Sequence, residues 1–327
     1  MKKVRAEYLT RRGGERNRRL VLVAGMTAAS LLLLRAIPAF SGDADGNLSA
    51  VQAVSGRETA GKVAVAGGDS ERGELPAASE MVKAVVANEL TDREQLLKWI
   101  CLIEKRAGKE TLTEEQVETR DGPLFRLLAI DGTALTPGQR EEDDARIGRL
   151  MKDPSSLQKL KQAQGDDELK LQKMLSLMPD SFLYEYDGAE GSLVRVKFRP
   201  NPQYTAPTYE ARVIHSLAGT ILIDPARKRM RKIACSMVNR VEFGYGLLGR
   251  IDNGTVELER VEVGTLQWKT AFINIHFSGR VAVFKSISKD QYERRSDFRE
   301  VASDLSLADG KELLLSRRAG IPAAALH

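Results

Sequence analysis

Leu193-Val-Arg-Val-Lys-Phe198 alternates apolar and charged side chains, and this stretch decides the class of fold. A period of two is that of a β-strand with one covered face and one solvent-facing face. Similar runs, joined by short Gly, Asp or Asn turns, fill most of the chain from Ser181 to Ser288. Strands with such short connections pair as antiparallel neighbours. The sequence therefore predicts a meandering antiparallel sheet.

The strand pattern also extends towards the N-terminus, where a helical stripe over 80–97 comes before the first strand. A sheet of about ten strands curls strongly. Since few helices are available to cover it, we expect a mainly antiparallel β fold with helices, in which a strongly curved open sheet forms a half β-barrel. The expected strands are 99–106, 110–118, 123–130, 182–186, 193–198, 211–215, 220–224, 229–234, 241–243, 255–263, 266–277 and 280–288.

A helical insertion at about 136–177 interrupts the strands. Thr136 is a natural N-cap, Pro137 suits the first helical position and Gln139 completes a capping box. The four acids at 141–144 follow in the first turns, where negative charge suits the helix dipole. A metal site is the alternative for these acids, but adjacent positions on a helix point in different directions. The dipole interpretation is therefore favoured.

The first 41 residues have the pattern of an export segment. A basic region is followed by an uncharged apolar run from Leu20 to Leu34, and small residues Ala39 and Ser41 come before Gly42. This order is typical of a secretory signal peptide, and fifteen residues are short for a spanning helix. Two alternatives stay open, a cleaved signal peptide and a retained N-terminal anchor that would contact the membrane. Both predict a periplasmic or cell-envelope location.

Once this segment is set aside, the basicity of the chain disappears. The whole chain has a net charge of +5, but residues 1–41 hold nine Lys or Arg and two Asp or Glu. The remaining residues therefore carry 41 basic and 43 acidic side chains, which argues against a nucleic-acid partner. Residues 42–79 lack aromatic side chains and are rich in Gly, Ala and Ser, so they predict a flexible linker. A single folded domain is expected over 80–316, followed by a tail at 317–327.

Several of these features together resemble a LolA-like outer-membrane lipoprotein carrier. They are the leading helix, the run of antiparallel strands, the turn Gly219-Thr-Ile-Leu-Ile-Asp224-Pro-Ala-Arg227-Lys-Arg-Met230 and the late strand Trp268-Lys-Thr-Ala-Phe-Ile-Asn-Ile-His276. The resemblance covers roughly residues 80–300. It implies a half-open β-barrel covered by helices, with a hydrophobic cavity for acyl chains. The helical insertion is larger than the coverings of the carrier, and no single residue here aligns with its lipoprotein-handling arginine.

The apolar face of the predicted strands supplies candidates for the lining of such a cavity. Alternation places Val213, His215 and Leu217 on one face, opposite Arg212 and Ser216. In the strand at 266–277 the parity changes, as expected where both faces are covered or a bulge intervenes. The alternative is that these side chains pack a closed core. The candidates are Phe182, Tyr184, Val194, Val196, Phe198, Val213, Leu217, Trp268 and Phe272.

The segment Gly244-Tyr245-Gly246-Leu247-Leu248-Gly249 matches the dinucleotide fingerprint by letter. That motif requires a following helix whose N-terminus faces the pyrophosphate, whereas a strand is expected here. Nucleotide binding is therefore not predicted. Two interpretations remain open, a glycine-rich connection and a mobile loop at the lip of the cavity that presents apolar side chains.

The residue types that usually carry chemistry are few. His215 and His276 are expected mid-strand with no acidic partner at metal-ligand spacing, so no metal site is predicted. Ser286-Ile-Ser-Lys289 spells a serine–lysine motif, but it lies on a predicted strand and lacks companion motifs. Cys101 and Cys235 either pair as a disulfide outside the inner membrane or remain two buried thiols.

These observations favour a binding protein that needs no cofactor and is not an enzyme. The main hypothesis is an exported envelope protein that holds a lipid, a lipoprotein acyl chain or another hydrophobic ligand in its concave face, as in outer-membrane lipoprotein sorting. The alternative is a periplasmic interaction or sensor module. In that case its own helices fill the concave face, and an edge strand or the 244–249 loop contacts another envelope protein.

Overall fold

The computed structural model describes residues 75–92, 98–245, 248–264, 267–281 and 285–316. The expected leader at 1–41, the linker up to residue 74 and the tail at 317–327 lie outside the described residues. Within the described part no helix is long and apolar enough to cross a membrane.

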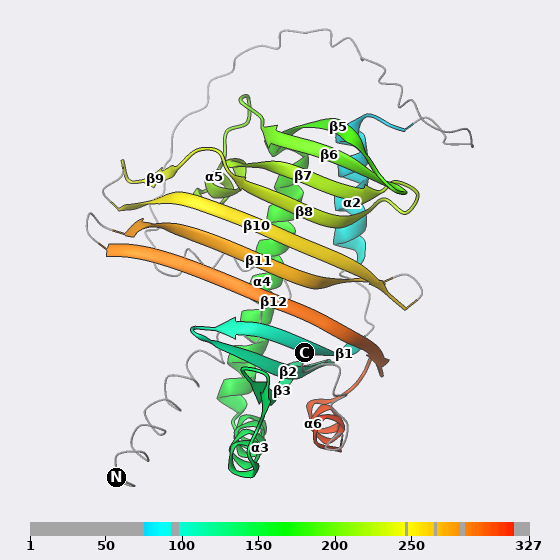
Figure 1. Ribbon diagram of the computed structural model, residues 1–327, viewed down its shortest axis with the longest axis vertical. Helices are drawn as coiled ribbons and strands as arrows, with labels where there is room; N and C mark the ends of the chain where they lie inside the picture. The colour runs from blue at the N-terminus through cyan, green and yellow to red at the C-terminus, as the bar shows by residue number, and fades with distance from the viewer. Residues whose placement is uncertain (1–74, 93–97, 246–247, 265–266, 282–284, 317–327) are drawn as a thin grey trace.

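The described chain folds into one open, mostly antiparallel sheet with a few helices (Figure 1). The helices are α2 Ala78–Asp92, α3 Pro137–Lys152, α4 Pro154–Ser181, α5 Tyr209–His215 and α6 Leu307–Ser316. The strands are β1 Lys98–Ala107, β2 Glu110–Thr119, β3 Gly122–Ile130, β4 Thr133–Ala134, β5 Phe182–Glu190, β6 Leu193–Pro200, β7 Leu217–Asp224, β8 Arg229–Met237, β9 Val241–Phe243, β10 Gly249–Val263, β11 Gln267–Val281 and β12 Lys285–Val301.

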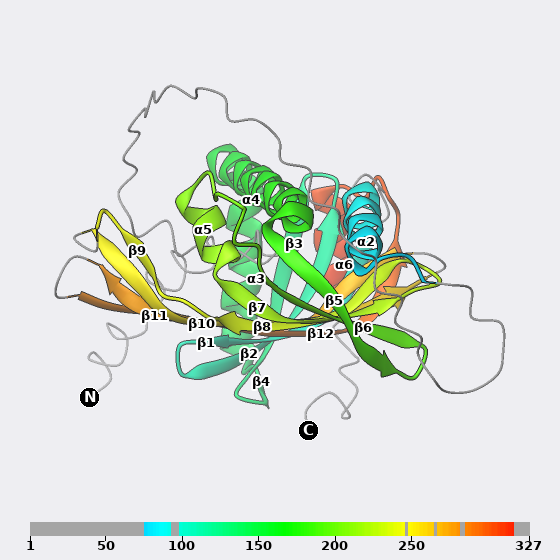
Figure 2. The same cartoon turned by 90° about the horizontal axis from the view of Figure 1, so that it is seen from above.

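The sheet is not a simple meander. Its order is β4-β3-β2-β1-β12-β11-β10-β8-β7-β6-β5, with β9 paired to β10. The two meanders at either end, β1–β4 and β5–β8, are therefore joined through β10, β11 and β12, and the last strand pairs with the first. Figure 2 shows that α2, α4 and α5 lie on one side of the curved sheet. One face of the sheet is thus covered by the protein's own helices.

The covered face holds the largest apolar cluster. Met81, Val82, Val85 and Val86 of α2 pack against side chains of β5 to β8, and Met174, Leu175 and Met178 of α4 add to the same cluster. Glu89 of α2 also forms a buried ion pair with Arg260 of β10. The leading helix therefore contributes to the core of the sheet.

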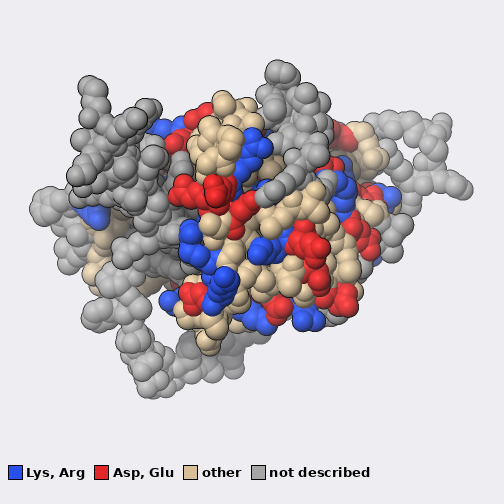
Figure 3. Space-filling model, turned by 90° about the horizontal axis from the view of Figure 1, so that it is seen from below, with Lys and Arg blue, Asp and Glu red and all other residues tan. Residues whose placement is uncertain are grey.

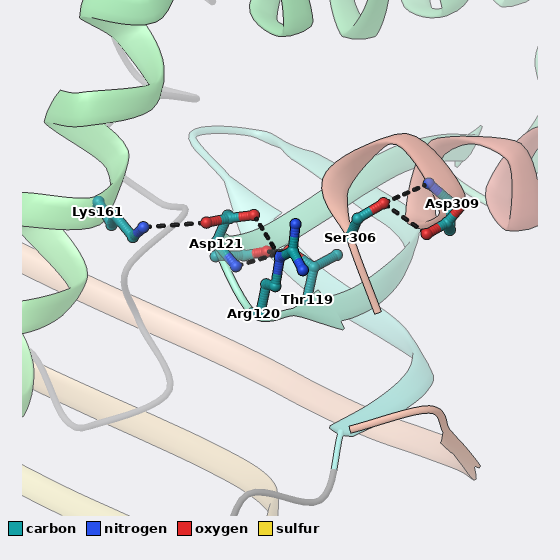
Figure 4. Close-up of polar contacts among 7 residues, drawn as sticks. Thr119, Arg120, Asp121, Lys161, Ser306 and Asp309 are labelled. Carbon is teal, nitrogen blue, oxygen red and sulfur yellow. Dashed lines mark hydrogen bonds and ion pairs between the residues drawn. The ribbon is translucent and has the colours of Figure 1, made fainter. Parts of the chain in front are cut away.

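The helix α4 reaches from one end of the sheet to the other. Near its start, Lys161 Nζ forms an ion pair with Asp121 in the β2–β3 turn at 3.0 Å, which lowers the pKa of that carboxyl (Figure 4). Near its end, the carbonyl of Met178 accepts a hydrogen bond of 2.7 Å from the hydroxyl of Tyr184 on β5. At 1.5 Å per residue, this helix of 28 residues is about 42 Å long, and it contacts both the β2–β3 turn and β5.

The predicted start of the helical insertion is confirmed, but the role predicted for its acids is wrong in part. The side chain of Thr136 accepts from the backbone of Gln139 and the reciprocal bond is also present. Asp143, however, is buried and accepts a hydrogen bond from the backbone NH of Leu127 on β3 at 3.0 Å. Asp144 forms an ion pair with Arg126. These two acids fasten α3 to the sheet, since each has a partner on β3 and neither lies in the first helical turn.

Two predicted strands are wrong. Residues 211–215 form the end of helix α5, which Thr208 caps by accepting from the NH of Ala211 at 3.2 Å. Residues 280–288 do not form one strand, because β11 ends at Val281 and β12 begins at Lys285, directly paired with it. The predicted strand therefore covers the end of β11 and the start of β12, and β12 continues to Val301.

Candidate functional site

Five of the predicted lining residues share one packed cluster. Phe182, Val194, Val196, Phe198 and Leu217 all belong to the cluster under α2 and α4, and Val196 and Phe198 are 0% and 2% exposed. Phe182 and Phe198 pack edge to face with ring centres 5.0 Å apart. Where these residues lie, the covered face of the sheet is filled by side chains from the protein's own helices.

Tyr184 and Val213 take different positions from those expected. Tyr184 is partly buried beside the same cluster, and burial raises the pKa of its hydroxyl well above the ordinary value. Val213 lies in helix α5 and packs with Phe243, Ile275 and Phe277 in a second cluster. The strand alternation that grouped Val213 with His215 and Leu217 is wrong, because Val213 and His215 lie in helix α5.

Trp268 and Phe272 are separated by a change of register. A bulge lies between Glu259 and Arg260, at the point where β10 pairs with β11. Trp268 is buried, with the guanidinium of Arg231 4.9 Å from its ring centre. Phe272 is only half-buried and packs edge to face against Tyr292 of β12 at 5.6 Å. The two aromatic side chains therefore do not line one surface.

The glycine-rich loop leads into a strand, as predicted. Gly244 and Tyr245 both have positive φ, 55° and 52°, and Gly249 is the first residue of β10. Tyr245 is fully exposed and Leu248 is half exposed, while Gly246 and Leu247 lie outside the described residues. Because no helix follows, the motif has no dipole to offer a pyrophosphate. Its exposed apolar tips remain a candidate contact surface.

The two cysteines cannot form the disulfide that the sequence left open. Both are free, Cys101 on β1 and Cys235 on β8. Three strands, β12, β11 and β10, lie between them in the sheet. With neighbouring strands about 4.8 Å apart, the two strands are about 19 Å apart, against the 7 Å that a disulfide tolerates. Burial raises the pKa of each thiol to about 12.

Of the two histidines, His276 lies within a strand as predicted and His215 does not. The Nδ1 of His276 lies 2.6 Å from a carboxylate oxygen of Asp290 on the neighbouring strand β12. This bond lowers the pKa of Asp290. His215 is helical, and its Nε2 contacts the carbonyl of Asn201 at 2.9 Å. Among the described residues no group of three His, Cys, Asp or Glu side chains is arranged to hold a metal ion.

The exposed face of the sheet was not foreseen. Lys232 of β8 bridges Glu257 and Glu259 of β10, and these bonds raise the pKa of the lysine. Further along, Arg294 of β12 stacks on Phe272. This face of the sheet therefore carries paired acidic and basic side chains with half-buried aromatic rings between them. Figure 3 views a different side of the molecule, from below, and there too acidic and basic side chains are intermixed.

The two edges of the sheet are finished in different ways. At one edge, β4 and helix α3 cover β3: besides the bond from Leu127 to Asp143, Arg146 donates to the carbonyl of Phe125 at 2.7 Å and to Asp143 at 2.8 Å. At the other edge, β5 is the last strand, and within the described ranges no strand pairs with its outer side. Among the described residues, side-chain bonds to the backbone of an edge are found at the first edge, from Asp143 and Arg146.

A shallow hollow of about 650 Å³ lies between the end of α3 and α6. Met151, Lys311, Glu312 and Leu315 are among its lining residues. It lies outside the cluster that holds the predicted lining residues. The α6 helix beside it begins after Ser306, whose hydroxyl caps the helix by accepting from the NH of Asp309 (Figure 4).

No family model, curated protein or solved structure matches this chain. The candidate sites therefore rest on the geometry alone. That geometry offers three surfaces: the exposed sheet face, the 244–249 loop and the open edge at β5.

Proposed function

We propose that this chain is an exported cell-envelope protein that binds another envelope protein and carries out no chemistry of its own. One observation carries the proposal: five of the nine side chains expected to line a ligand cavity, those of β5, β6 and β7, are packed against α2 and α4 instead. A sheet whose covered face is filled in this way has its free surface on the outside. Exposed apolar side chains such as Tyr245 and Leu248 mark contact surfaces of this kind.

The envelope location is part of the proposal. It is supported by the basic-then-apolar pattern of residues 1–41 and by the small residues before Gly42. The nearly balanced charge of the remaining chain is in keeping with a protein partner and argues against nucleic acid.

A carrier related to the LolA family is the second candidate. Two observations favour it: the sheet is curved and open, and a single long helix spans it. Methionines at 81, 174, 178, 230 and 237 also lie between the sheet and its helices. Methionine side chains adapt their shape to different neighbours. In a half-barrel of this type, an acyl chain would have to displace α2, which packs on the cluster through Met81, Val82, Val85 and Val86.

Titration of the full chain with a fluorescent fatty acid separates the two candidates. We expect no saturable uptake, because Val196 and Phe198 are 0% and 2% exposed under the helices that cover them. Saturable uptake of one probe per chain would overturn the proposal if the variant Tyr245→Ser/Leu248→Ser, which removes only exposed apolar tips, takes up the probe equally well.

A further inference from the structure

The open edge of the sheet is the feature that points to a class of partner. Edge strands carry a row of NH and carbonyl groups that accept another strand unless something blocks them. At the β3 edge Asp143 and Arg146 occupy such groups. In the described structure β5, at the top of the sheet in Figure 1, has no such covering strand or side-chain bond along its outer side. The fold therefore protects one edge and leaves the other available.

The exposed side chains of β5 are acidic. Glu185, Asp187 and Glu190 are all exposed. On its inner side β5 already pairs with a basic strand, because β6 carries Arg195, Lys197 and Arg199. Glu185 is the register partner of Lys197, and Glu190 forms an ion pair with Arg195 at 2.7 Å. The acids of β5 thus have basic neighbours on one side and an open edge on the other.

A second copy of the chain would pair poorly at this edge. Two β5 strands brought together antiparallel would place acids beside acids, and like charges directly across a sheet destabilise the pairing. A strand with Lys or Arg at alternate positions would instead repeat the arrangement that β6 makes. Opposite charges on neighbouring strands stabilise the pair through side chains about 5 Å apart.

We propose that β5 binds an extended basic segment of a partner protein as an added antiparallel or parallel strand. This inference rests on the proposed function, since it names the partner chemistry of the interaction module. Backbone hydrogen bonds along 183–190 supply the affinity, as in other cases of strand addition, and the acids select for Lys or Arg. The bulge in the β5–β6 pairing between Tyr186 and Ala189 limits the longest regular stretch to the first half of the strand.

The test uses the full chain and three labelled seven-residue peptides. The first alternates Lys and Val, the second replaces each Lys by Glu, and the third is the Lys–Val peptide with N-methyl groups on alternate backbone nitrogens. We expect the Lys–Val peptide to bind in fluorescence anisotropy and to slow amide hydrogen exchange in 183–190. The Glu peptide is expected not to bind. The N-methylated peptide keeps its charge but loses backbone donors, so it is also expected to fail.

Matched charge reversals locate the contact. Glu185→Lys/Asp187→Lys changes two exposed acids of β5, and we expect binding of the Lys–Val peptide to weaken by about tenfold or more. Glu141→Lys/Glu142→Lys makes the same change of charge at two exposed positions of α3, and binding should stay the same.

Four outcomes would overturn the inference. They are no binding of the Lys–Val peptide, equal binding of the N-methylated peptide, slowed exchange elsewhere but not in 183–190, and a dimer of the chain itself that the β5 reversal abolishes. The fatty-acid titration distinguishes a failure of the edge-strand inference from a failure of the proposed function. A chain that takes up neither fatty acid nor peptide loses only the edge inference, whereas saturable fatty-acid uptake removes the proposed function.

Discussion

Asp143 of α3 accepts a hydrogen bond of 3.0 Å from the backbone NH of Leu127, a residue of β3 that lies sixteen positions earlier in the chain. The same carboxylate is held by Arg146, which donates in turn to the carbonyl of Phe125. One helix thus supplies both an acceptor and a donor to the backbone of an edge strand. The sheet ends at this point because its backbone groups are already occupied.

Removing the Asp143 carboxylate from this edge should lower the stability of the protein measurably. In Asp143→Ala the part-buried NH of Leu127 loses its acceptor, which we expect to lower the free energy of unfolding by about 1–3 kcal/mol. Urea denaturation followed by circular dichroism measures it. Glu142→Ala, at the neighbouring exposed position, is the control and should change little. Equal stability of the two variants would show that the bond does not hold the edge.

The packing of the covered face predicts a strong effect at Phe198. It is 2% exposed and contacts Phe182 edge to face, so Phe198→Ala removes a fully packed ring. Such a truncation costs about 3–5 kcal/mol in unfolding free energy. If Phe198 instead lined an empty cavity, the variant would keep most of its stability. Tyr245→Ala, which removes a fully exposed ring, serves as the control.

The cysteines should behave as two protected thiols. Burial raises the pKa of Cys101 and Cys235 to about 12, so little thiolate exists at pH 8. We expect slow reaction of the native chain with a thiol reagent and rapid reaction of two thiols per chain in denaturant. A mass lower by two hydrogens, with no reactive thiol after denaturation without reductant, would contradict the separation of β1 from β8.

The start of α4 predicts a dependence on pH. Asp153 accepts hydrogen bonds from Ser155 and Ser156, and these bonds lower the pKa of its carboxyl to about 2. Since the folded-state pKa lies below the ordinary value of 3.8, the stabilisation is present above about pH 4 and is lost as the pH falls towards 2.

Asp153→Ala should therefore be less stable than the parent chain at pH 6, and the difference should shrink as the pH falls towards 2.5. Urea unfolding at each pH provides the comparison. Asp166→Ala, at an exposed position of the same helix, is the control. A difference in stability that stays constant over this range would contradict the capping role.

The sequence was sufficient for the elements whose covered positions are apolar. In β6 the residues Val194, Val196 and Phe198 alternate with charged neighbours, and the strand forms where the pattern predicts it. The capping box at Thr136 could also be predicted from the sequence, because it depends on residues three positions apart.

The strand β12 was predicted only as far as Ser288, because its later buried positions are polar or charged. Gln291, Glu293 and Arg295 are buried, and Glu293 and Arg295 form an ion pair with each other. On β1 and β2, Lys105 pairs with Glu114 at 2.6 Å, again with both side chains buried. Hydrophobic periodicity does not predict a strand whose buried side chains are paired charges, because such a strand lacks the alternation of apolar and polar residues.

The remaining errors follow from contacts distant in sequence. The contact between His276 and Asp290 joins residues 14 positions apart on two paired strands, so it depends on the register of β11 and β12. The seven residues of α5 are too few for a helical period to outweigh the alternation that they also show. The open edge at β5 depends on the order of the strands, which pairs β1 with β12 and leaves β5 at the end.

Native mass spectrometry tests the central claim most directly. The full chain is purified gently, weighed intact, and then extracted with organic solvent for lipid analysis. A sheet filled by its own helices predicts the mass of the protein without lipid, with any bound mass being another protein. One lipid or acyl chain per molecule, retained in the exposed-loop variant Tyr245→Ser/Leu248→Ser, would contradict the account and establish the carrier.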